Sequence, residues 1–239
     1  MNLVLIDAHE IHDGICTLAD ARATHIQTFL HASIGSTFRV GIIDGLQGSA
    51  TVTAIDNNAV TFTVDCTEPA LAPWYDLILA LPRPRSLKRI LFQSATMGVR
   101  NIFIVGAKKV EKSYFSMHLL REEEYRPVLI EGLMQGKTTA LPRLTIVPKF
   151  RDLWALLPEE ATLRLIANPA TSQPTFSLQN GFPLIAVGPD GGWTEQENAA
   201  FAEHGFVPMT LGERPLRTDT AAIALPAVVH DRLHFRNNL

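Results

Sequence analysis

Two stretches near the end of the chain decide the fold: Ile185-Ala186-Val187-Gly188-Pro189-Asp190-Gly191-Gly192-Trp193-Thr194 and Leu211-Gly212-Glu213-Arg214-Pro215-Leu216-Arg217-Thr218-Asp219-Thr220-Ala221-Ala222. In each stretch an apolar run breaks at glycine, and a helix then begins. A buried strand, a loop of glycine and proline, and a helix start together form the place where open α/β sheets bind ligands, outside the carboxyl ends of the strands. Two such loops in succession predict one shared pocket.

Strands alternate with helices over residues 74–239. Strands are predicted over 77–81, 102–105, 144–147, 163–167, 184–187 and 207–211, and helices over 86–97, 115–135, 151–157 and 219–232. This alternation predicts an α/β domain with a mostly parallel sheet that helices cover on both faces.

The first 70 residues are instead β-rich. Alternating apolar and polar residues predict strands over 2–6, 37–43, 49–55 and 60–66, and one helix over 20–32 interrupts them. This pattern predicts a small β-barrel, closed so that its edges are covered. The segment 68–73, with two prolines, is the predicted linker, so we expect one domain over 1–70 and another over 74–239.

Charge is unevenly distributed, although the formal net charge of the 239 residues is only −3. Residues 1–72 carry two basic and eight acidic groups, whereas 83–151 carry fourteen Lys or Arg and five Glu. Arg83, Arg85, Lys88 and Arg89 fall within seven positions. Such a cluster is the electrostatic footprint of phosphate binding, and the alternative is a solvated helix face.

The cysteines, the histidines and the lengths of the apolar runs argue against disulfide-rich, metal-binding and membrane-spanning proteins. Cys16 and Cys66 have no metal-ligand spacing around them and indicate buried free thiols in a reducing compartment. The eight histidines form no zinc-binding pattern, so no metal is expected. Without a leader-like start or an apolar run of membrane-spanning length, the sequence predicts a cytoplasmic protein with no membrane partner.

Three loops follow the last predicted strands at equivalent ends: Asn168-Pro169, 188–192 and 212–220. In a parallel sheet these loops converge, and glycine lets backbone approach a ligand closely. Thr194 and Glu197 fit a capping box that takes the chain from the glycine turn into a helix. The alternative for Gly-Pro-Asp-Gly-Gly taken alone is a simple turn.

Arg217 is the main candidate side chain of the second stretch. A cation in a loop of small and apolar residues needs a partner, and the candidates are Asp190, Asp219 or a ligand oxygen. The alternative role for Arg217 is a structural ion pair. Thr218 and Thr220 are candidates both for helix caps and for ligand contacts.

At these same residues the chain resembles the RsmE-type 16S rRNA uridine N3 methyltransferases of the SPOUT superfamily. That family carries Gly-Pro-Glu-Gly-Gly and then Leu-Gly-x-Arg-x-Leu-Arg-Thr-Glu-Thr-Ala, which correspond here to Gly188–Gly192 and Leu211–Ala221. The resemblance implies a PUA-like barrel, a SPOUT domain with a deep trefoil knot, S-adenosylmethionine as cofactor, and a homodimer that acts on ribosomal RNA or the small ribosomal subunit.

The resemblance also implies roles for individual residues. Arg217 and Asp190 are the catalytic candidates. The cofactor-binding candidates are Ala167, Asn168, Pro169, Val187, Gly188, Pro189, Gly191, Gly192, Leu211, Gly212, Leu216, Thr218, Thr220 and Ala221. The RNA-binding candidates are Arg83, Arg85, Lys88, Arg89, Lys137 and Arg214.

By analogy with the family, the methyl group goes to N3 of a uridine. Arg217 would stabilise the charge that spreads onto O2 and O4, and either Asp190 or solvent would take the N3 proton. Departures from the family pattern include Asp190 and Asp219 in place of glutamates and Gln93 in place of a helix lysine. Two alternatives therefore stay open: a related enzyme with a different target nucleotide, and a non-catalytic RNA-binding or ribosome-assembly protein.

Overall fold

The computed structural model describes residues 3–168 and 181–234, which divide into two compact units. The first unit comprises residues 1–72 and 130–141, and the second comprises 73–129 and 142–239. The division after Ala72 falls in the predicted linker. Residues 130–141 join the first unit although they lie within the second in sequence, a placement that no local pattern indicates.

The first unit is built on a mixed six-stranded sheet. Its strands are β1 (Leu3–Ile6), β2 (Ile11–His12), β3 (Ile15–Leu18), β4 (Thr37–Ile42), β5 (Gln47–Ile55) and β6 (Val60–Glu68), in the order β1-β4-β5-β6-β3-β2. Helix α1 spans Ala21–Thr28. The core of this unit includes Val4 and Ile6 from β1 and Cys16 and Leu18 from β3. Strands β1 and β2 stand at opposite ends of the strand order, although only residues 7–10 separate them in the chain. The sheet is therefore strongly curved.

The two cysteines are free thiols with different environments. Cys16 is fully buried, and burial raises the pKa of its thiol to about 11. Cys66 is only half-buried, unlike the prediction, and its thiol contacts the carbonyl oxygen of Val40 at 3.8 Å.

The second unit is an α/β domain with six parallel strands, as predicted. They are β7 (Tyr75–Ala80), β8 (Val99–Val105), β9 (Arg143–Val147), β10 (Leu163–Ala167), β11 (Pro183–Val187) and β12 (Val207–Met209), in the order β12-β10-β11-β7-β8-β9. The helices are α2 (Pro84–Thr96), α3 (Glu122–Gly136), of which residues 130–136 belong to the first unit, α4 (Glu195–Glu203) and α5 (Thr218–His234).

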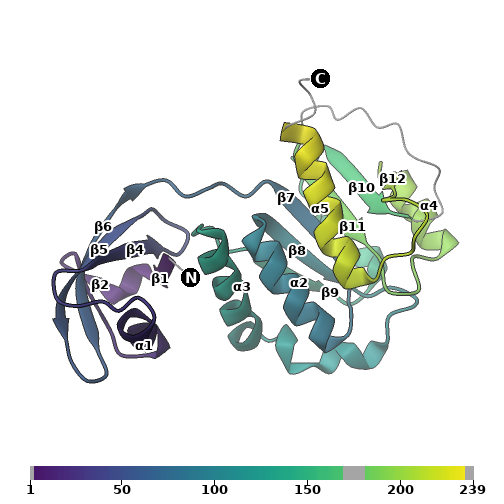
Figure 1. Ribbon diagram of the computed structural model, residues 1–239. Coiled ribbons are helices and arrows are strands. Elements are labelled where there is room, and N and C mark those ends of the chain that lie inside the picture. Colours follow the sequence, from purple (N-terminus) through teal and green to yellow (C-terminus); the bar gives the residue numbers. More distant parts are fainter. Residues whose placement is uncertain (1–2, 169–180, 235–239) are drawn as a thin grey trace. The chain divides into compact units, whose positions relative to one another are not determined.

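Helical elements cover both faces of this parallel sheet. Helices α2 and α5 pack against each other on one face, α2 on β8 and α5 on β11 (Figure 1). On the other face, Phe201 of α4 packs with Phe150, Trp193 and alternate strand residues such as Ile78. Strands that are buried on both sides, such as β7, require this arrangement.

A buried carboxylate fixes the amino ends of the central strands. Asp76 is inaccessible to solvent and accepts hydrogen bonds from Arg100 Nη2 at 2.7 Å, from the Asn101 backbone N–H at 3.0 Å and from Asn101 Nδ2 at 2.9 Å. Because each bond replaces one lost to water, the charge is tolerated in the core.

Strands β2 and β3 of the first unit were not predicted, and the helix predicted over 20–32 is shorter, at Ala21–Thr28. Three elements of the second unit differ from the sequence prediction for local reasons. The helix predicted over 115–135 begins only at Glu122, after two 3₁₀ turns, where three glutamates suit a helix N-terminus. The helix predicted over 151–157 is two 3₁₀ turns between Pro148 and Pro158. The last strand ends at Met209, because the Thr210 hydroxyl bonds to the Gly212 backbone instead.

Candidate functional site

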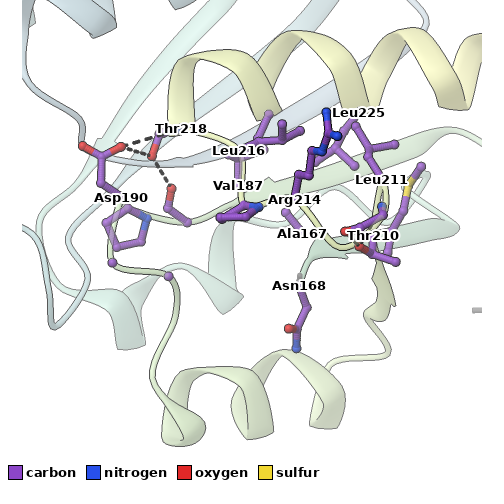
Figure 2. A pocket seen from close by; sticks show the side chains of 18 residues that line it. Ala167, Asn168, Val187, Asp190, Thr210, Leu211, Arg214, Leu216, Thr218 and Leu225 are labelled. Atoms are coloured by element: carbon purple, nitrogen blue, oxygen red, sulfur yellow. Dashed lines mark hydrogen bonds between the residues drawn. The ribbon is translucent and has the colours of Figure 1, made fainter. Parts of the chain in front are cut away.

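A cavity of about 260 Å³ lies at the carboxyl ends of β10, β11 and β12 (Figure 2). Its walls are mostly backbone, small residues and apolar side chains, and we call it the glycine-loop cavity. It is lined by Ala167, Asn168, Val187, Gly188, Pro189, Asp190, Gly191, Gly192, Met209, Thr210, Leu211, Gly212, Arg214, Pro215, Leu216, Thr218, Ala221 and Leu225.

The cavity brings together most of the candidate residues. Twelve of the fourteen cofactor-binding candidates line it; Thr220 is not among the lining residues, and Pro169 lies outside the described residues. Of the catalytic candidates, Asp190 lines the cavity and Arg217 does not.

Four lining residues were not among the candidates: Met209, Thr210, Pro215 and Leu225. Three of them lie within or beside the second sequence stretch. Leu225 follows Ala221 by one helical turn, so the i, i+4 spacing on the final helix is the signal that identifies it. The side chains of Met209 and Leu225 add apolar lining to the cavity, and the loop sequence does not indicate this contribution.

The glycine loop has the shape that its sequence predicts. Thr194 caps α4 and the predicted capping box is confirmed, because the Glu197 N–H donates to Thr194 Oγ1 at 3.2 Å and the Thr194 N–H donates to Glu197 Oε2 at 2.8 Å. Gly192 has φ of 68°, in the left-handed region that favours glycine. A side chain at Gly188 would begin 3.1 Å from the Trp193 ring, so this position has little room for one.

Thr218 connects the glycine loop to the start of α5. Its Oγ1 lies 3.0 Å from the carbonyl oxygen of Gly188 and 3.1 Å from Asp190 Oδ1, and its N–H donates to the same Asp190 oxygen at 3.4 Å (Figure 2). These bonds join the two sequence stretches at one end of the cavity. Arg214, Leu211 and Leu225 lie toward the other end (Figure 2).

Arg217 lies beside the cavity, next in sequence to Leu216 and Thr218, and its side chain is 72% exposed. Of its predicted partners the structure selects Asp219, whose Oδ1 lies 3.8 Å from Arg217 Nε. The second oxygen of buried Asp219 pairs with Arg89 Nη1 at 3.0 Å. One buried carboxylate thus contacts two exposed guanidinium groups, from α2 and from the residue before α5.

The loop after β8 also reaches the glycine loop. Lys109 Nζ donates to the carbonyl oxygen of Gly191 at 2.6 Å, and the Lys108 backbone N–H donates to Glu197 Oε1 at 2.7 Å. Sequence reasoning missed this contact, because the partners are 82 residues apart along the chain. It places a lysine against the backbone that forms the cavity wall.

Comparison with known proteins identifies the family. The family described as RNA methyltransferase domain matches residues 70–230 of the chain. The ribosomal RNA small subunit methyltransferase E of Treponema pallidum is 34% identical, over 98% of this chain and 92% of that protein. The chain belongs to this RNA methyltransferase family. A second relative of the same name, from Borreliella burgdorferi, is 29% identical over 98% of this chain and 99% of its own length.

A solved structure shows the same fold. The ribosomal RNA small subunit methyltransferase E of Neisseria gonorrhoeae, determined with bound S-adenosylmethionine, superposes with a TM-score of 0.77 at 23% identity, over 95% of this chain and 96% of that one. The likeness spans both units of this family member, so both sheets belong to the shared architecture.

The basic candidates of this family member are exposed but lie in different places. Arg83 precedes α2, while Arg85, Lys88 and Arg89 lie on it. Lys137 follows α3 in the first unit with a positive φ of 54°. Among these basic candidates, Arg89 forms an ion pair with the Asp219 carboxylate.

The described part of the chain holds neither a metal-ligand cluster nor a membrane-spanning helix. No group of three or more His, Cys, Asp or Glu residues is placed to hold a metal ion there. No helix over 3–168 or 181–234 has the length and apolar character needed to cross a bilayer.

Proposed function

We propose that this protein methylates N3 of a uridine in the 16S rRNA of the small ribosomal subunit, with S-adenosylmethionine as the methyl donor. The observation that carries the proposal is the glycine-loop cavity, which gathers both family stretches at the carboxyl ends of three parallel strands. The relatives' names and the S-adenosylmethionine bound to the Neisseria gonorrhoeae protein support the substrate and the donor.

The residues of the cavity fit this donor. Val187, Met209 and Leu225 give apolar surface for an adenine ring, while the loop backbone of 188–192 offers amide and carbonyl groups for polar contacts. The Asp190 carboxylate lies at the cavity wall, where negative charge suits a cationic sulfonium compound. When bound, S-adenosylmethionine supplies an electrophilic methyl group.

Arg217 acts on the RNA base in this proposal. The uridine N3 loses its proton, and negative charge spreads onto O2 and O4. A guanidinium fixed near these oxygens stabilises that charge. Arg217 suits the role because it is exposed beside the cavity, where a base arriving from solvent meets it, and Asp219 orients it.

Asp190 and solvent are the two candidates for removing the N3 proton. Asp190 Oδ1 accepts hydrogen bonds from Thr218, which orient the carboxylate, and no described residue donates to Oδ2. Alignment of N3 with the methyl carbon supplies a large part of the acceleration, since both groups are held in one site.

The proposal includes the finer architecture of the family. The curved first sheet supports a PUA-like barrel. In this proposal the first unit is an RNA-binding domain, and the second is a SPOUT methyltransferase domain with a trefoil knot. The protein would act as a homodimer. Phosphates of the RNA would be held by Arg83, Arg85, Lys88, Arg89, Lys137 and Arg214.

The test is Arg217→Ala, assayed by mass-spectrometric mapping of methylated small-subunit rRNA. We expect the rate to fall by at least about 100-fold, as for other removed charge-stabilising groups. Calorimetry should show unchanged affinity for S-adenosylmethionine. Arg143→Ala, which removes an exposed arginine at the start of β9, is the matched control and should retain full activity. Near-normal methylation by Arg217→Ala would contradict the assigned role, and methylation at another atom would contradict the uridine N3 assignment.

A further inference from the structure

A second cavity lies at the carboxyl ends of β8 and β9 in the second unit. Its volume is about 800 Å³, and it shares no lining residue with the glycine-loop cavity. We call it the aromatic cavity, because Phe115, Phe150 and Trp154 contribute to its walls. Nothing in the proposed methyl transfer uses it.

The aromatic walls are held rigidly from behind. Trp154 stacks on the His204 ring with centroids 3.9 Å apart and planes 11° apart. Phe150 and Trp154 each meet Phe201 edge to face, at 5.4 and 5.3 Å. Both rings remain half-buried rather than buried, so part of each is left for a ligand. A fixed and partly open aromatic surface is suited to stacking because binding orders few side chains.

Three cations line the same cavity: Lys108, Lys112 and Arg151. All three are exposed, and Arg151 is 79% exposed with only a 3.5 Å contact to neighbouring Asp152. Within the described residues, the ammonium groups of Lys108 and Lys112 make no ion pair.

One carboxylate, Glu197, also lines the cavity, but its oxygens are already used. It is 7% exposed; Oε1 accepts from the Lys108 backbone, and Oε2 accepts from the Thr194 backbone and hydroxyl. The three cations outnumber this single buried carboxylate, so the lining carries a net positive charge. Cations beside aromatic rings are the combination by which proteins bind single-stranded nucleic acid, with phosphate on the cations and a base on the rings.

We infer that the aromatic cavity binds one unstacked nucleotide of the RNA substrate, separate from the nucleotide that receives the methyl group. Its volume suits a ligand of this size. The two nucleotides are distinct because the aromatic cavity shares no lining residue with the glycine-loop cavity, where the methyl donor is proposed to bind. The inference rests on the proposed RNA substrate and deepens it, since it defines a second contact that positions the strand.

The experiment measures binding of fluorescein-labelled single-stranded RNA hexamers, oligoadenylate and oligouridylate, by fluorescence anisotropy. Lys112→Glu/Arg151→Glu reverses two exposed charges and should weaken binding by at least about 10-fold and flatten the salt dependence. Arg143→Glu reverses one exposed charge, half the change of the double variant, at the amino end of β9 and should change the affinity by less than about 2-fold.

Phe115→Ala tests stacking separately from charge. We expect hexamer affinity to fall about 5-fold with an unchanged salt dependence, because the base contact carries no charge. Ultraviolet cross-linking of the wild-type complex should mark tryptic peptides 113–121 or 152–164, which contain Phe115 and Trp154. This readout does not depend on how any variant folds.

Two further assays separate this inference from the proposed function: calorimetry with S-adenosylmethionine and methylation of small-subunit rRNA. Weaker hexamer binding with unchanged donor affinity supports the cavity assignment, even if the wild-type protein methylated a different RNA. Unchanged hexamer affinity in both cavity variants overturns it, while wild-type methylation leaves the proposed function standing.

Discussion

The two cavities of the second unit lie at the same end of the same parallel sheet, yet their walls differ in chemistry. The glycine-loop cavity, at β10–β12, is formed by backbone, small residues and apolar side chains. The aromatic cavity, at β8 and β9, presents rings and three cations. Sheet topology thus fixes where a ligand binds, whereas the composition of each loop fixes which class of ligand fits.

The largest change in ligand affinity should come from variants that fill one cavity and leave the other open. Ala221→Phe places a ring in the glycine-loop cavity of about 260 Å³, and we expect affinity for S-adenosylmethionine to fall by at least about 100-fold in calorimetry, about 2.7 kcal/mol. Ala107→Phe, the matched change in the aromatic cavity, should leave donor affinity unchanged and weaken RNA binding. Equal loss of donor affinity in both variants would mean that the cavities are not independent.

The next largest effect should be a difference in salt dependence between RNA binding and donor binding. RNA binding that uses about three phosphate contacts should weaken about 20-fold between 50 and 200 mM salt, because binding releases counterions. Donor affinity should change by less than about 2-fold, since the glycine-loop cavity binds mainly through backbone and apolar contacts. Anisotropy measures the RNA affinity and calorimetry the donor affinity over the same salt series. Equal salt dependence of the two affinities would contradict the distinction between the cavities.

Thr218→Val tests the join between the two sequence stretches. The valine keeps the shape but removes the hydroxyl bond to Gly188 or Asp190, and we expect about a 10-fold loss of donor affinity, which corresponds to about one hydrogen bond. Thr218→Ser restores the hydroxyl and should recover the affinity. Calorimetry measures the donor affinity of both variants. A valine variant that binds the donor as well as wild type would show that the Thr218 hydroxyl bond is not needed for donor binding.

The smallest effect concerns the lysine between the two cavities. Lys109→Met removes the exposed bond to the Gly191 carbonyl oxygen, and we expect about a 3-fold loss of donor affinity. Lys112→Met removes a neighbouring cation that lines only the aromatic cavity, so donor affinity should not change. If both variants lost donor affinity to the same extent, general charge rather than the Gly191 contact would be the cause.

Several elements could be predicted from the sequence because their causes are local. Apolar strands ending at glycine predicted the parallel sheet and the converging loops at 188–192 and 212–220. The spacing of Thr194 and Glu197 predicted the capping box. The helix predicted over 115–135 starts later, since helix ends depend on capping and flanking turns more than on apolar periodicity.

Other features depend on residues far apart along the chain. The contact between Lys109 and Gly191, the sharing of Asp219 by Arg89 and Arg217, and the aromatic cavity all join segments that no periodicity relates. Arg217 illustrates the limit: its loop predicted a need for a partner, but Asp190 and Asp219 were equally available until the fold placed Asp219 closest.

The sequence by itself determined the parallel α/β sheet, the family and the loops that form the glycine-loop cavity, because strand periodicity, turn chemistry and motif order are encoded within short windows. Only the tertiary structure decided that Lys108, Lys112 and Arg151 gather around Phe115, Phe150 and Trp154. The physical reason is that a cavity arises where packed elements meet, and the position of that meeting depends on the strand order β11-β7-β8-β9 rather than on any single segment.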